Sequence, residues 1–201
     1  MKLAGAAAAR YFARPEPERT GLLIFGADAM RVALRRQEVV ATLIGPEGEA
    51  EMRLTRIAAA DLRKDPALLA DAVKAQGFFP GPRVTLVEDA GDGLAPLIGG
   101  ALADWRAGDA VVIVTAGALA AKSALRALFE KHANAYAIGI YDDPPGREEI
   151  EAALARAGLK DVGRDAMGEL MALARDLDPG DFRQTIEKIA LYKHADASPL
   201  T

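Results

Sequence analysis

The sequence predicts an α/β fold, in which a mostly parallel sheet carries helices on both faces, followed by a small helical domain. Up to residue 141, short runs rich in β-branched residues alternate with longer amphipathic runs, which is typical of parallel strands joined by helices. The rhythm changes at DDPPG, residues 142–146, after which every apolar pattern has the helical period.

Five apolar runs are predicted to form the strands of the sheet. They are GLLIF at 21–25, EMRLTRI at 51–57, RVTLVED at 83–89, AVVIVT at 110–115 and AYAIGIY at 135–141. Amphipathic runs at 28–44, 65–76, 94–105 and 123–132 are predicted as the connecting helices, and Asp28 is placed to cap the first of them. The alanine run near the N-terminus, interrupted by Arg10 and Arg14, predicts a short helix and not a signal peptide.

Three further helices are predicted after residue 146. Apolar spacing marks residues 147–157, 164–177 and 179–193, and Pro179 suits a first helical turn. The predicted organisation is therefore an α/β domain at 1–143 and a three-helix domain at 144–201.

Composition limits the classes of function. The chain has 201 residues and no cysteine, which excludes disulfides and thiolate metal sites and favours a cytoplasmic location. No run approaches the ~18 apolar residues of a membrane span. A net charge of -4 argues against tight binding of nucleic acid by this chain alone.

The places where a nucleotide phosphate would bind lack the required residues. The first strand runs into FGADAM, which has one glycine, no lysine and Asp28 where a phosphate would sit. AGALAAKS at 116–123 has alanines in place of both signature glycines. Glu88 and Asp89 occupy the positions at which nucleotide hydrolases bind Mg²⁺. Such an ion is usually bound jointly with substrate phosphates, for which this chain lacks a binding loop. We therefore expect no cofactor, no metal and no catalysis.

Two adjacent phenylalanines, Phe78 and Phe79, stand in a turn bounded by Gly77 and Pro80, just before an apolar strand. From the residues alone, two interpretations remain open. Aromatic side chains beside a buried strand often pack into the core, whereas a paired aromatic on a stiff turn is typical of a binding hot spot.

Four segments match, in order, the pattern of one family. They are LLIFGADAMRV at 22–32, GFFPGPRVTLVED at 77–89, AKSALRALFEK at 121–131 and GDFRQTIEKIALY at 180–192. The family has Tyr/Phe-Gly-x-Asp, then Ser-Leu-Phe-Gly-x-x-Arg, then a helix after the fourth strand, then Gly-Asp-Leu followed by Glu-x-x-Lys-Leu-x-x-Tyr. The chain thus resembles the delta subunit of bacterial DNA polymerase III, a part of the sliding-clamp loader.

The resemblance implies a function without catalysis by this chain, although the family belongs to a DNA-directed DNA polymerase, a nucleotidyltransferase. The α/β part looks like an AAA+ ATPase domain that no longer binds nucleotide, and the helical part looks like its lid. The family's clamp-binding Leu-Phe falls on Phe78 and Phe79, and a further apolar contact falls on Gln76, whose polar side chain leaves its contribution open. The implied partner is the sliding clamp (beta subunit), whose ring the delta subunit helps to open, and DNA is contacted only indirectly.

The family also carries a third, helical collar domain that joins the other loader subunits. This sequence ends at ASPLT before that domain, so we expect a fragment that contacts the clamp without assembling a loader. Two alternatives stay open. One is an active P-loop ATPase using Lys122, Ser123, Glu88 and Asp89, and the other is a direct DNA-binding module.

Overall fold

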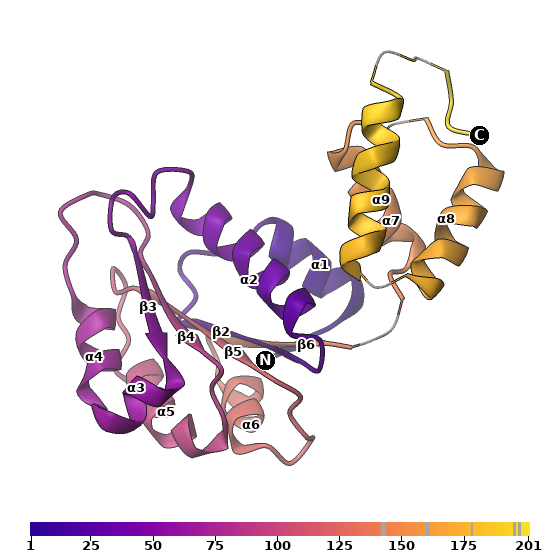
Figure 1. The fold of residues 1–201 in the computed structure, drawn as a ribbon. Coiled ribbons are helices and arrows are strands. Elements are labelled where there is room, and N and C mark those ends of the chain that lie inside the picture. Colours follow the sequence, from indigo (N-terminus) through magenta and orange to yellow (C-terminus); the bar gives the residue numbers. More distant parts are fainter. Residues whose placement is uncertain (142–143, 160, 178, 195, 197) are drawn as a thin grey trace. The chain divides into compact units, whose positions relative to one another are not determined.

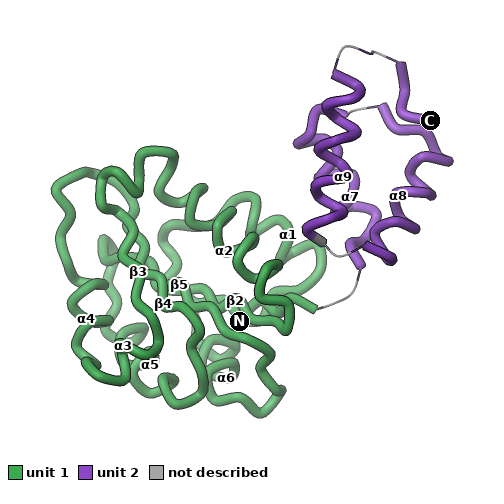
Figure 2. The backbone as a smooth tube through the Cα atoms, in the orientation of Figure 1, with its two compact units in different colours: residues 1–141 green, residues 142–201 purple. Residues whose placement is uncertain are grey.

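The computed structural model describes residues 1–141, 144–159, 161–177, 179–194, 196 and 198–201. The chain divides into two compact units, Met1–Tyr141 and Asp142–Thr201 (Figure 2). The domain boundary predicted at residue 143 itself lies outside the described residues.

A six-stranded sheet with every strand parallel forms the centre of the first unit (Figure 1). Its strands lie side by side in the order β1-β6-β2-β5-β4-β3. Their bounds are β1 Lys2–Leu3, β2 Gly21–Gly26, β3 Leu54–Ala58, β4 Val84–Glu88, β5 Val111–Ala116 and β6 Ala135–Ile140. The predicted parallel sheet is confirmed. The edge strand β1 was not predicted, because two residues are too few to show alternation.

Helices connect the strands and cover both faces of the sheet (Figure 1). Their bounds are α1 Gly5–Ala13, α2 Ala29–Ile44, α3 Ala59–Lys64, α4 Ala67–Lys74, α5 Ala95–Ala103 and α6 Ala124–Lys131, with a 3-10 turn, η1, at Asp92–Leu94. The prediction missed α3, which follows β3 without a break. Asp28 caps α2 as predicted, because its carboxylate accepts hydrogen bonds from the backbone N–H groups of Met30 and Arg31.

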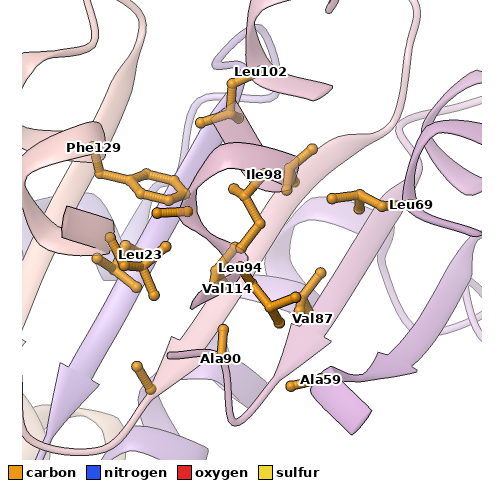
Figure 3. Packing of buried hydrophobic residues seen from close by; sticks show 14 of the residues in the cluster. Leu23, Ala59, Leu69, Val87, Ala90, Leu94, Ile98, Leu102, Val114 and Phe129 are labelled. Atoms are coloured by element: carbon orange, nitrogen blue, oxygen red, sulfur yellow. The ribbon is translucent and has the colours of Figure 1, made fainter. Parts of the chain in front are cut away.

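Alternation along the strands divides the core into two layers. Leu22 and Ile24 of β2 pack with α1 and α2 on one face, whereas Leu23 and Phe25 pack with α3 to α6 on the other (Figure 3). Successive side chains of a strand point to opposite faces, so strands buried on both sides must be apolar throughout. This explains why the central strands are almost continuous runs of Val, Ile and Leu.

The parallel sheet also separates two functional ends. Parallel α/β sheets bind ligands at the carboxyl ends of their strands, where the loops that follow β2, β4 and β5 lie. The loop with Phe78 and Phe79 precedes β4, so it lies at the opposite, amino end. Any site formed by these rings is therefore distinct from the place of a nucleotide site.

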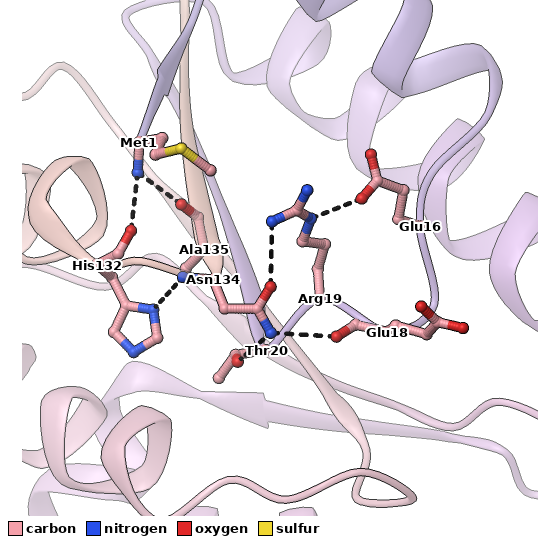
Figure 4. Close-up of polar contacts among 8 residues, drawn as sticks. All are labelled: Met1, Glu16, Glu18, Arg19, Thr20, His132, Asn134 and Ala135. Atoms are coloured by element: carbon pink, nitrogen blue, oxygen red, sulfur yellow. Dashed lines mark hydrogen bonds and ion pairs between the residues drawn. The ribbon is translucent and has the colours of Figure 1, made fainter.

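A cluster of hydrogen bonds joins the N-terminus and the segment before β2 to the residues around the start of β6 (Figure 4). The amino group of Met1 donates hydrogen bonds to the backbone carbonyls of Phe129, His132 and Ala135. Asn134 accepts a hydrogen bond from Arg19 and donates to the hydroxyl of Thr20. The carbonyl groups that end α6 thereby receive donors from a remote part of the chain.

His132, the residue at the C-terminal cap of α6, makes the stability of the fold depend on pH. Burial is the main cause that lowers its pKa below the ordinary 6.5, and the nearby amino group of Met1 adds to the effect, while a backbone hydrogen bond with Leu102 opposes it. Its Nδ1 accepts a hydrogen bond from the backbone N–H of Asn134 at 3.1 Å, which requires the unprotonated ring.

Below pH 6.5 the unfolded chain therefore binds a proton more readily than the folded chain. We expect the free energy of unfolding to fall as the pH drops below this value, and the loss to be complete below the folded-state pKa. Urea unfolding at a series of pH values between pH 8 and pH 5 measures this change in the free energy of unfolding. The variant His132→Gln should show a weaker pH dependence than the wild type, and an unchanged slope would refute the role of this ring.

The described residues of the second unit form three helices, close to the predicted positions. They are α7 Arg147–Arg156, α8 Arg164–Asp176 and α9 Pro179–Tyr192. Their common core holds Ile150, Leu154, Met167, Leu170 and Phe182, among others. Among the described helices of the whole chain, none is long and apolar enough to cross a membrane.

Candidate partner-binding site

The phenylalanines of the chain fall into two groups. Phe12, Phe25, Phe129 and Phe182 are buried in the three hydrophobic clusters. The remaining two of the six are exposed, Phe78 at 94% and Phe79 at 44%. The interpretation of these rings as core residues is therefore wrong for Phe78, and Phe79 is only half covered.

Both rings stand on the loop between α4 and β4, which we call the tip loop (residues 75–83). Gln76 is exposed on the same loop, so the structure brings all three predicted site residues to one surface. The backbone around Phe78 and Phe79 is bend and irregular structure between the Gly77 and Pro80 positions. The two rings thus project from a short segment with rigid elements on either side.

Two arginines hold the tip loop to the domain. Arg53, just before β3, donates from Nη1 to the carbonyl of Pro82 at 3.3 Å and is itself held by the carboxylate of Glu51 at 2.6 Å. Arg83 donates from Nη2 to the carbonyl of Gly108 at 2.7 Å. The loop is therefore fixed from two neighbouring loops, which limits the entropy lost when a partner binds.

Gly81 gives the tip loop a backbone that other residues rarely adopt. Its φ is +120°, and an added Cβ would lie 3.0 Å from Nη1 of Arg53. Alanine here is strained and displaces the arginine that holds the loop, so we expect Gly81→Ala to lower the free energy of unfolding by ~1–2 kcal/mol.

Gly100→Ala is the matched control for Gly81→Ala. Gly100 lies inside α5, where an added Cβ meets no other atom within 4 Å. This variant should raise the stability by ~0.5–1 kcal/mol, because alanine favours a helix interior. Thermal unfolding of both variants provides the comparison, and equal shifts of the same sign would contradict the strain at Gly81.

The position where a phosphate would meet α2 is filled by a side chain of the protein. The carboxylate of Asp28 accepts from the N–H of Met30 at 2.9 Å and from that of Arg31 at 3.0 Å. These are the groups that a phosphate at a helix N-terminus would use. The negative charge of Asp28 would also repel the ligand.

Two of the four residues of the ATPase alternative, Glu88 and Ser123, are held by contacts within the domain. Glu88 is paired with Arg36 of α2, and Asp89 has a left-handed backbone with φ +57°. Ser123 is buried as the N-cap of α6 and donates a hydrogen bond to Asp92, while Lys122 is exposed. The carboxylate of Glu88 and the hydroxyl of Ser123 are thus engaged in structural contacts. The described residues contain no group of three or more potential metal ligands.

A pocket of about 350 Å³ lies between α2 and β3, lined by Val40, Ile44, Leu54 and the side chains of Arg36 and Arg56. Both arginines are paired, Arg36 with Glu88 and Arg56 with Glu49. Their charges are therefore neutralised within the domain and do not point to an anionic ligand.

Two residues near the tip loop were not predicted from the sequence to belong to the candidate site. Arg53 and the exposed Met52 lie more than twenty residues before the tip loop and were predicted to be part of a strand at 51–57. In the structure β3 begins only at Leu54, because a turn precedes it in which Met52 has φ +54°. The glycines at 45 and 48 were the signal for that turn.

Comparison with solved structures identifies the architecture. The Bacillus subtilis DNA clamp loader delta protein matches with a TM-score of 0.66 over 96% of this chain, at 16% sequence identity. The chain has the fold of a clamp-loader delta protein. It spans 59% of the length of that structure.

A second solved structure, domain III of the Thermotoga maritima replication initiation protein DnaA, matches with a TM-score of 0.49, 13% identity, and coverage of 97% of this chain and 85% of that one. Neither the models of protein families nor the curated proteins gave a match to the sequence. The match to the Bacillus subtilis protein alone confirms, at the level of the fold, the delta-protein likeness that the four sequence segments implied.

Proposed function

We propose that this chain is a clamp-loader delta module that binds the ring-shaped sliding clamp of DNA replication and favours opening of the ring. The observation that carries the proposal is the pair of exposed rings, Phe78 and Phe79, on the tip loop. The delta-protein fold supports it. Exposed adjacent aromatics are costly in water and are enriched at the centres of protein interfaces.

In this proposal the two rings enter an apolar pocket of the clamp. Full burial of one such side chain contributes ~1.5–3 kcal/mol, so two rings suffice to anchor a complex. Ring opening follows only if the module binds the open ring more tightly than the closed ring. Gln76, beside the rings, would contribute at the rim of the contact.

Other loader subunits would supply and hydrolyse ATP and would join this protein through a further domain outside this chain. DNA would be contacted only indirectly, in keeping with the net charge of -4. A cytoplasmic location and the two-domain organisation of an AAA+-like part with a helical lid belong to the same proposal.

Two measurements test the proposal. Surface plasmon resonance should detect binding of the purified chain to the sliding clamp of the same organism. A clamp that carries a self-quenching pair of fluorophores across one subunit interface should gain fluorescence when the chain is added. Absence of binding at concentrations up to the millimolar range would refute the proposal.

The ATPase alternative is separated by calorimetry. We expect no heat of binding when ATP and Mg²⁺ are titrated into the chain, because Asp28 occupies the N-terminus of α2 and Glu88 is paired with Arg36. Asp28→Ala should cost ~1 kcal/mol of stability through loss of the helix cap and should not create ATP binding. Micromolar binding by the wild type would overturn our choice.

A further inference from the structure

Met52, in the turn before β3, is exposed at 68% and adopts a left-handed backbone with φ +54°. Backbone hydrogen bonds fix this turn, since the N–H of Met52 donates to Glu49 and the N–H of Arg53 donates to Gly48. A left-handed backbone favours glycine over any residue with a Cβ, and an exposed methionine gains nothing from the core. The chain therefore holds a large apolar side chain in solvent on a strained backbone, a combination typical of functional surfaces.

The turn of Met52 adjoins the tip loop. Met52 lines a small pocket of about 60 Å³ together with Gln76 and Gly77 of the tip loop. Arg53 joins the two segments, because its guanidinium donates to the carbonyl of Pro82. Figure 1 shows both loops at the same end of β3 and β4.

We infer that Met52 is a third apolar contact of the surface formed by Phe78 and Phe79, and that the sliding clamp covers all three side chains. The inference rests on the proposed function, since it assigns the same partner to a wider surface. Continuity across the shared pocket favours a single occupant. A methionine also suits such a contact, because its flexible, polarisable side chain adapts to an apolar partner surface.

Met52→Gly tests this inference with two readouts of opposite sign. Glycine relieves the backbone, so the melting temperature of the variant should rise above that of the wild type. Loss of the side chain should at the same time weaken clamp binding by about tenfold in surface plasmon resonance. A structural role alone would move stability and binding in the same direction.

Two further variants separate the side chain from the backbone. Met52→Asn tolerates the left-handed backbone without an apolar side chain and should lose binding to the same extent as Met52→Gly. Met52→Leu keeps the apolar volume and should bind within about twofold of the wild type. Weak binding by Met52→Leu together with normal binding by Met52→Asn would overturn the inference.

Met30 provides a matched control, because it is exposed at 61% but lies at the start of α2, at the other end of the sheet. Met30→Ala should leave clamp binding unchanged, whereas Met52→Ala should weaken it. If Phe78→Ala/Phe79→Ala loses binding while Met52→Gly binds like the wild type, only this inference is wrong. If the phenylalanine variant binds normally, the proposed function fails as well.

A second copy of this chain is the competing occupant. Sedimentation velocity of the wild type and of Met52→Gly, each without clamp, tests it. The inference predicts the same sedimentation coefficient for both at all concentrations. A concentration-dependent dimer that Met52→Gly abolishes would assign this surface to self-association and overturn the assignment to the clamp.

Discussion

Replacing Phe78 and Phe79 together by alanine should lower the affinity of the chain for the sliding clamp by at least ~100-fold. The reason is the area that the rings would bury. Full burial of each contributes ~1.5–3 kcal/mol, and a factor of ten in affinity corresponds to ~1.4 kcal/mol. Surface plasmon resonance with immobilised clamp measures the loss directly.

The same variant should unfold at nearly the temperature of the wild type. Phe78 is almost fully exposed and Phe79 is half exposed, and surface substitutions usually change stability by less than ~0.5 kcal/mol. Phe78→Leu is the conservative control, since it keeps an apolar wedge and should retain most of the binding. A large drop in the melting temperature of the double alanine variant would instead show that the rings support the core.

Phe129→Ala should have the opposite profile and destabilise the first unit by ~3–5 kcal/mol. Phe129 of α6 is 0% exposed and packs in the cluster with Leu23 and Leu102 (Figure 3). Leu125 belongs to the same cluster. Removing its ring leaves a cavity that neighbouring side chains fill only in part. Urea unfolding followed by circular dichroism gives the free-energy difference.

Phe129→Leu serves as the graded control for this core position. It retains most of the apolar volume and should cost clearly less than the alanine variant. A loss below ~1 kcal/mol for Phe129→Ala would contradict the packing described for this layer. Together with the Phe78→Ala/Phe79→Ala variant, the comparison separates phenylalanines that stabilise the fold from those that we propose to contact a partner.

Local sequence patterns were sufficient to predict most elements of the fold. The central strands are recognisable because burial on both faces requires continuous apolar runs, and Asp28 because a helix N-terminus needs an acceptor. Local patterns did not predict elements that are very short or that follow the preceding element without a turn between them. The two-residue β1 and the helix α3, which follows β3 directly, are the examples.

For the candidate site too, some features could be predicted from the sequence and others could not. The turn that carries Phe78 and Phe79 could be predicted from its glycines and prolines, but their exposure could not, since an aromatic beside a buried strand packs inward as often as outward. Their exposure is a property of the packing between elements and not of the local sequence.

Residues close together in the chain are enough to specify the alternation of strands and helices, the cap of α2 and the lack of a phosphate loop. Three contacts become visible only in the folded chain: Arg53 reaches Pro82, 29 residues away, Glu88 is neutralised by Arg36, and Met52 lies beside the tip loop. The first and the last of these contacts follow from the strand order, which places β3 next to β4 at the edge of the sheet. The pair of Glu88 and Arg36 follows from the packing of α2 against the sheet. Strand order is fixed by the free energy of packing the whole unit, and no local pattern encodes it.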